Sequence, residues 1–141
     1  MKNVIIIGCG IAGPTLAMAL QKCGINSTIY ESQESPSDNR GLFLYLGPNG
    51  VNIFKTLGIE DKIREHGYRC NKAVFEKHNG NAIAELSEID YEKRFGTSSI
   101  VIKRAIMQKI MREQTESHGI NIEWNKKLES ITNDTGGDTI T

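Results

Sequence analysis

The spacing of apolar residues changes from one segment to the next near the start of the chain. The run Val4-Ile5-Ile6-Ile7 is uninterrupted, which is typical of a buried strand. Residues 11–23 carry apolar side chains at helical spacing, and Gly24 is a typical residue just beyond a helix. Residues 26–30 then predict a second strand, which we expect to pair in parallel with the first.

The pattern beyond residue 31 predicts short elements joined by polar connections. An Asn-Gly pair within residues 78–81 separates two alternating runs, 73–76 and 82–84, and predicts a β-hairpin. Residues 104–117 predict a long amphipathic helix that ends at His118-Gly119. The other expected elements are a polar loop over 31–40, an extended segment over 41–46, helices over 51–57 and 60–66, a polar connection over 90–96, an extended segment over 99–102, strands over 120–124 and 127–132, a turn over 133–138 and a return strand beginning at 139–141.

Together these elements indicate an α/β fold built on a parallel sheet. A doubly wound domain of this kind needs strands on both sides of its first strand, which cover the sheet and complete the ligand crevice. The 141 residues supply strands on one side only. We therefore expect a truncated product or the first piece of a longer protein.

Composition excludes several classes of function. Seventeen basic and seventeen acidic residues cancel, so no global field attracts nucleic acid or an anionic membrane. The three cysteines form no CxxC pair and the histidines do not cluster, so we expect neither a disulfide framework nor a metal site, and a cytoplasmic location fits best. No stretch is long enough for a membrane-spanning helix or a signal peptide. The expected partner is a small molecule bound at a local site.

The turn after the first strand has the spacing GxGxxG. Gly8 lets the chain reverse sharply, Gly10 lets backbone approach a pyrophosphate, and Gly13 lets the helix pack closely on the strand. The first free N–H groups of the helix, where Ile11 and Ala12 lie, then face the anion together with the positive end of the helix dipole. These five residues are candidate contacts of a dinucleotide.

Glu31 follows 23 residues after Gly8, at the tip of the second strand, where a carboxylate can accept hydrogen bonds from the adenosine ribose hydroxyls. Its charge would repel a 2′-phosphate, so NADP is disfavoured at this site. The strand, turn, helix and acid together are the context that the motif requires. The alternative is a glycine-rich turn with a structural role only. Cys9 is interpreted as a small side chain that fills the turn.

The segment after Glu31 distinguishes two classes of dinucleotide-binding fold. A nicotinamide dehydrogenase would continue with another helix and a third parallel strand within a few tens of residues. Here a polar loop, an extended segment, two short helices and a hairpin come first. That insertion is typical of flavin-dependent folds.

Four motifs in order resemble the N-terminal half of the single-component FAD-dependent aromatic monooxygenases, a family that includes para-hydroxybenzoate hydroxylase-like and tetracycline-inactivating flavoproteins. The motifs are Gly8-Cys9-Gly10-Ile11-Ala12-Gly13-Pro14 with Glu31, Arg40-Gly41-Leu42, Gly47-Pro48-Asn49-Gly50 leading into 54–58, and Ile102-Lys103-Arg104. The resemblance covers essentially the whole chain. It implies a Rossmann-like FAD-binding fold with a parallel sheet and an inserted hairpin, present over residues 1–141 as a partial domain.

The resemblance also implies further cofactor contacts. Arg40 matches an arginine that lies near the flavin and its phosphates, and Arg104 matches one that reaches the pyrophosphate or ribityl region, where a bidentate guanidinium suits a diphosphate. Leu128 matches a strand whose backbone borders the adenine. The alternatives are solvated surface arginines and a leucine that only packs in the core.

The function implied by the resemblance is oxygenation of an aromatic or polycyclic small molecule, with NAD(P)H as reductant and O₂ as co-substrate. The family's later motifs, which hold the ribityl chain, and its substrate-covering sheet do not occur in these residues, so we expect this chain alone to be inactive. No catalytic side chain is identified. The alternatives are a non-catalytic NAD- or ADP-binding module and another FAD-dependent oxidoreductase.

Overall fold

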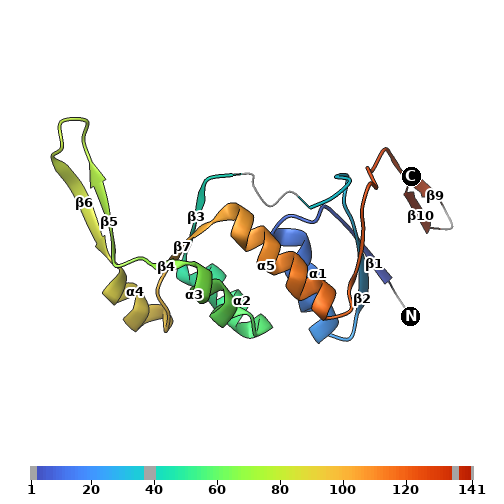
Figure 1. The fold of residues 1–141 in the computed structure, drawn as a ribbon, viewed down its shortest axis with the longest axis horizontal. Coiled ribbons are helices and arrows are strands. Elements are labelled where there is room, and N and C mark those ends of the chain that lie inside the picture. Colours follow the sequence, from blue (N-terminus) through green and yellow to red (C-terminus); the bar gives the residue numbers. More distant parts are fainter. Residues whose placement is uncertain (1–2, 37–40, 135–136, 141) are drawn as a thin grey trace. The chain divides into compact units, whose positions relative to one another are not determined.

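A computed structural model describes residues 3–36, 41–134 and 137–140 of the protein, shown in Figure 1. The chain forms two compact units. The first consists of residues 1–38 and 108–141, and the second of residues 39–107. Each unit is built around its own small sheet.

The first unit contains a three-stranded parallel sheet with the order β1-β2-β8. Its elements are β1 (Asn3–Ile7), α1 (Ala12–Lys22), β2 (Asn26–Tyr30), residues 108–117 of α5 (Arg104–Ser117), β8 (Asn121–Glu123), β9 (Ile131–Asp134) and β10 (Gly137–Ile140). Thr28 is aligned with Ile5 of β1 on one side and with Asn121 of β8 on the other. The strand, helix and parallel strand predicted at the start of the chain are therefore confirmed.

Buried apolar side chains fix this arrangement. They include Ile6, Met18, Ile29, Met111 and Ile120, each less than one tenth exposed. Because removal of apolar surface from water dominates folding, these residues from two helices, two strands and the position before β8 hold the sheet and helices together.

Strand β1 forms one edge of the parallel sheet. Among the described strands it pairs with β2 alone. Ile5 and Ile7 on this strand remain 43% and 46% exposed.

The second unit contains an antiparallel sheet with the order β3-β7-β4 and a separate hairpin of β5 and β6. Its elements are β3 (Phe43–Leu46), α2 (Pro48–Leu57), α3 (Glu60–His66), β4 (Tyr68–Arg69), β5 (Lys72–Glu76), β6 (Ala82–Ser87), α4 (Glu88–Phe95), β7 (Ile100–Lys103) and the first turn of α5. Figure 1 shows the hairpin extending beyond α4. The hairpin predicted around the Asn-Gly pair is confirmed.

Local sequence explains the bounds of α2. Pro48 begins the helix, where its missing N–H and fixed φ are tolerated, and Gly58 ends it in the left-handed conformation with φ 79°. Val51, Phe54 and Leu57 recur at helical spacing and are buried. One face of this short helix therefore belongs to the core of the second unit.

Two expectations for secondary structure are wrong. Residues 88–95 form helix α4, where a polar connection over 90–96 is expected from the many charges. Charged residues such as Glu, Lys and Arg are good helix formers, and the tilted rings of Tyr91 and Phe95 lie one turn apart with their centroids 5.9 Å from each other. Gly96, in the left-handed conformation, ends the helix.

The second error concerns the end of the chain. Residues 126–130 form no regular element, so the strand expected over 127–132 begins only at Ile131, and Leu128 lies outside it. Strand residues 133–134 and 137–138 replace most of the expected turn, while its centre lies outside the described residues. A strand is predicted from apolar residues at every second position, and Leu128 alone does not make such a pattern.

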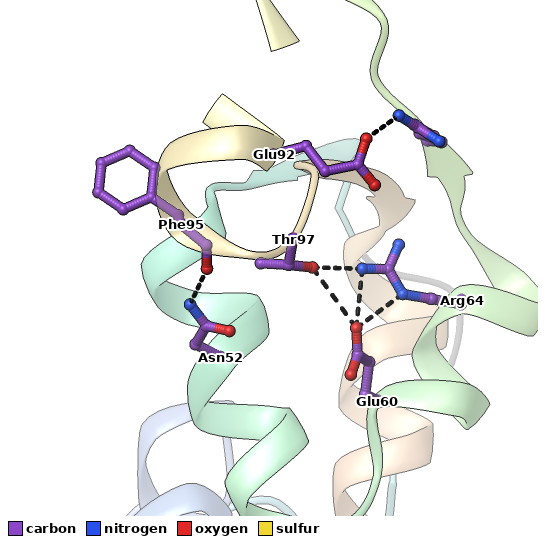
Figure 2. A network of polar contacts seen from close by, with 7 residues as sticks. Asn52, Glu60, Arg64, Glu92, Phe95 and Thr97 are labelled. Carbon is purple, nitrogen blue, oxygen red and sulfur yellow. Dashed lines mark hydrogen bonds and ion pairs between the residues drawn. The ribbon is translucent and has the colours of Figure 1, made fainter. Parts of the chain in front are cut away.

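A network of polar contacts joins α3 to the segment that leads into β7 (Figure 2). The Arg64 guanidinium lies 2.7 Å from the Glu60 carboxylate and also donates to the hydroxyl of Thr97, which is only 3% exposed. Nearby, the Asn52 side chain donates to the carbonyl of Phe95. These contacts satisfy buried polar groups that would otherwise destabilise the unit.

No helix within the described ranges combines the length and the apolar character needed to cross a lipid bilayer.

We predict that Thr97→Val lowers the free energy of unfolding by about 2 kcal/mol, because a buried hydroxyl bonded to charged groups is lost while the volume is kept. Thr56→Val is the matched control. Its hydroxyl donates only to the carbonyl of Asn52 on the surface, so we expect a change of at most about 0.5 kcal/mol. Urea denaturation of both variants measures the difference, and equal losses would contradict the role of the network.

Candidate dinucleotide-binding site

The turn between β1 and α1 uses its three glycines for different reasons. Gly8 has a φ of 99°, and its N–H donates to the carbonyl of Tyr30 at 2.8 Å, which extends the pairing of β1 with β2. A Cβ added at Gly13 would lie 2.0 Å from the Gly8 carbonyl oxygen, so a side chain cannot be accommodated there. A Cβ added at Gly10 would meet nothing within 4 Å, so the turn is open on that side. The turn thus has tight packing on one side and free access on the other.

The N-terminus of α1 keeps its hydrogen-bond donors available. Ile11 is the N-cap, Ala12 is the first helical residue, and among the described residues no side chain caps the helix. No acidic residue occurs in the first turn. The unpaired N–H groups and the positive end of the dipole are therefore free to meet an anion.

Glu31 lies directly after β2, and its carboxylate points to the glycine-rich turn. The N–H of Cys9 donates to Oε2 at 2.7 Å, and the N–H of Gln33 donates to Oε1 at 3.0 Å. The Ser32 hydroxyl also donates to Oε1 at 3.1 Å. These contacts hold the carboxylate in place beside the turn.

The same contacts set the protonation state of Glu31. Partial burial alone would raise its pKa, but the hydrogen bonds from the backbone of Cys9 and Gln33 and from Ser32 outweigh it and hold the pKa below its ordinary value. The carboxylate is therefore charged at neutral pH. A negative charge at this point favours ribose hydroxyl groups as donors and disfavours phosphate.

The pKa of Cys9 is shifted in the opposite direction from that of Glu31. Burial, and secondarily the charge of Glu31, raises the pKa of the Cys9 thiol to about 11. The thiol is neutral at physiological pH and hence a poor nucleophile. This agrees with the interpretation of Cys9 as a residue that fills the turn.

A third segment, after β8, runs beside Glu31. The backbone N–H of Glu31 donates to the carbonyl of Glu123, and the N–H of Lys126 donates to the carbonyl of Glu31, both at 2.8 Å. Asn125, with a φ of 55°, makes the turn between them and donates to Gln33. Sequence analysis missed this segment, although Asn is one of the few residues that enter the left-handed conformation readily. Half-buried Leu128 follows two residues after Lys126.

The two candidate arginines are not part of this arrangement as described. Arg40 lies outside the described residues. Arg104 belongs to the second unit, where it is exposed and begins α5, and its N–H donates to the carbonyl of Leu42 at 3.0 Å. Of the nine predicted contacts, seven therefore lie in the first unit. Over the described part of the chain, no three His, Cys, Asp or Glu side chains form a group that could hold a metal ion.

We predict that Gly13→Ala lowers the free energy of unfolding by about 3 kcal/mol, because its methyl group would collide with the backbone of Gly8. Gly10→Ala should change it by at most about 0.5 kcal/mol, since the added methyl group has open space. Urea denaturation of the two variants tests the asymmetry of the turn. A stable Gly13→Ala variant would contradict it.

A second prediction concerns pH. Because the folded-state pKa of Glu31 is lowered, its ionised form stabilises the fold fully above the unfolded-state value of about 4.5, and this contribution is lost as the pH falls further. The difference in unfolding free energy between the protein and Glu31→Gln should be constant near neutral pH and shrink below that value. Denaturation curves across the acidic range measure it, and a difference that grows on acidification would refute the assignment.

Comparison with known proteins identifies relatives of this chain. The 6-hydroxynicotinate 3-monooxygenase of Pseudomonas fluorescens is 29% identical over 115 residues, which cover 79% of this chain and 29% of that protein. The FAD-dependent urate hydroxylase of Mycolicibacterium vanbaalenii is 26% identical over 137 residues, which cover 96% of this chain and 34% of that protein. The chain thus spans about a third of the length of the relatives that it matches.

The fold is also found in crystal structures. Klebsiella pneumoniae HpxO complexed with FAD and uric acid matches with a TM-score of 0.80 at 24% identity, over 99% of this chain and 34% of that one. The family model described as "FAD binding domain" matches residues 1–141. Since this match covers the whole chain, the protein belongs to the FAD-binding domain family.

Proposed function

We propose that this chain is the FAD-binding portion of a monooxygenase that oxygenates an aromatic or polycyclic small molecule with NAD(P)H and O₂. The observation that carries the proposal is the Glu31 carboxylate, which the Cys9 N–H holds against a turn left open at Gly10. A dinucleotide needs both features at once, a carboxylate for its ribose and free backbone for its pyrophosphate.

The residues of the first unit have separable tasks in this proposal. Glu31 accepts hydrogen bonds from the adenosine ribose, and its charge excludes a 2′-phosphate from this site. Gly8, Gly10 and Gly13 shape the turn, while Ile11 and Ala12 present the helix N-terminus to the pyrophosphate. Leu128 borders the adenine from the segment after β8.

We also propose, from the family resemblance, that Arg104 and Arg40 bind the FAD diphosphate. Arg104 is the first residue of the 14-residue helix α5, whose dipole favours an anion rather than a cation at that end. Among the described residues its guanidinium has no hydrogen-bond or ion-pair partner. Both facts support an anionic ligand such as the FAD diphosphate, which a guanidinium binds with two parallel hydrogen bonds.

FAD, when bound, supplies the redox chemistry, while the protein binds it, orients it and excludes water. The relatives named for 6-hydroxynicotinate and urate support a small aromatic heterocycle as the substrate class. We also propose that residues 1–141 are a partial domain, with the substrate domain and the later FAD motifs elsewhere in the protein, and that these residues alone are inactive. A cytoplasmic location, where NAD(P)H is available, fits this function.

The test uses the full-length protein from the complete reading frame. It should purify with a flavin absorption band and bind FAD stoichiometrically. Glu31→Gln should raise the dissociation constant for FAD about tenfold, equivalent to about 1.4 kcal/mol, because the ribose loses a charged acceptor. Glu34→Gln, an exposed neighbour in the same loop, is the matched control and should leave the constant unchanged.

The same titration distinguishes the proposed flavoprotein from the alternative, a module that binds NAD or ADP. Stoichiometric uptake of NAD or ADP without any uptake of FAD would refute the flavoprotein and favour a nicotinamide- or nucleotide-binding module, since the same turn and acid can hold either adenine dinucleotide.

A further inference from the structure

Gly41 lies against the side chain of Arg104 in the second unit. A Cβ built at Gly41 would lie 3.2 Å from Cδ, 3.3 Å from Cβ and 3.6 Å from Cγ of Arg104. The aliphatic stem of the arginine therefore lies across the bare backbone of the glycine. A side chain at position 41 would force this stem to move.

Backbone contacts fix the two residues relative to each other. The N–H of Arg104 donates to the carbonyl of Leu42 at 3.0 Å, and Phe43 is aligned with Lys103 in the antiparallel pair of β3 and β7. Gly41 itself has a φ of 99°, a conformation that only glycine adopts without strain. The start of α5 is thus tied to the start of β3, and Gly41 offers the arginine stem a flat surface.

A free arginine side chain samples many rotamers, and ordering it on binding costs affinity. The absence of a side chain at Gly41 leaves room for the stem to lie against the backbone, while the guanidinium stays exposed and without a partner among the described residues. A stem that lies against the backbone and a charged end that stays free together favour preorganised recognition of an anion.

We propose that Gly41 is a positioning residue for FAD binding, which acts by holding the Arg104 side chain in the orientation that meets the FAD diphosphate. This inference rests on the proposed function of Arg104. It gives Gly41 a role beyond its backbone conformation. It also explains why the glycine and the arginine, more than 60 positions apart in the sequence, meet at one point.

Two effects of a substitution at Gly41 must be separated, backbone strain and displacement of the arginine. Gly58 is the matched control because it also has a positive φ, 79°, in the same unit, whereas a Cβ there would meet nothing within 4 Å. Gly58→Ala therefore introduces strain without displacing a side chain.

The experiment is a double-mutant cycle in the full-length protein. Dissociation constants for FAD, from quenching of flavin fluorescence, and thermal unfolding midpoints are measured for Gly41→Ala, Arg104→Ala, the double variant and Gly58→Ala. We expect Arg104→Ala to weaken FAD binding about tenfold and Gly41→Ala about fivefold, with the double variant no weaker than Arg104→Ala. Gly58→Ala should lower the midpoint and leave the dissociation constant unchanged.

The alternative outcomes overturn different statements. If Gly41→Ala weakens FAD binding equally with and without Arg104, or if Gly58→Ala weakens it as much, Gly41 has a structural role only. If Arg104→Ala binds FAD like the parent protein, the inference and the role of Arg104 fall while the flavoprotein stands. If the parent binds no FAD, the proposed function itself fails. Should Gly41→Ala not fold, Gly41→Asn replaces it, because Asn tolerates a positive φ better.

Discussion

The hydrogen bond from the Cys9 N–H to the Glu31 carboxylate is the contact on which the first unit's site depends. It joins the turn after β1 to the residue after β2. Because the two strands are parallel, their carboxyl ends lie side by side, which brings these two points together. Adjacent bonds reinforce it, since the Gly8 N–H meets the Tyr30 carbonyl and the Glu31 N–H meets the Glu123 carbonyl. The position of the acid is thus set by the sheet and not by a loop.

The sequence predicts this part well because its signals are local. An apolar run, three spaced glycines and an acid at the end of the next strand each specify one physical requirement, and the structure places all of them at one turn. The hairpin of β5 and β6 follows from its Asn-Gly pair for the same reason. Each of these features can be recognised within a short window of residues.

Other features depend on information that a short window does not hold. The sequence did not predict helix α4, because many charged residues occur both in exposed helices and in loops. The backbone of 123–126 beside Glu31 and the contact of Gly41 with Arg104 join residues far apart in the chain, and only the pairing of the strands brings them together. The resemblance predicts a cofactor contact at Arg104, but no local pattern in the sequence indicates that Gly41 lies against its side chain.

The edge position of β1 has a practical consequence for work with these residues. Among the described strands none covers the outer side of β1, so its N–H and carbonyl groups are offered to any other extended chain, and the half-exposed Ile5 and Ile7 add an apolar surface beside them. Produced in isolation, residues 1–141 will tend to aggregate or to recruit foreign strands. Low protein concentration and a solubilising fusion partner are therefore the sensible starting conditions for their purification.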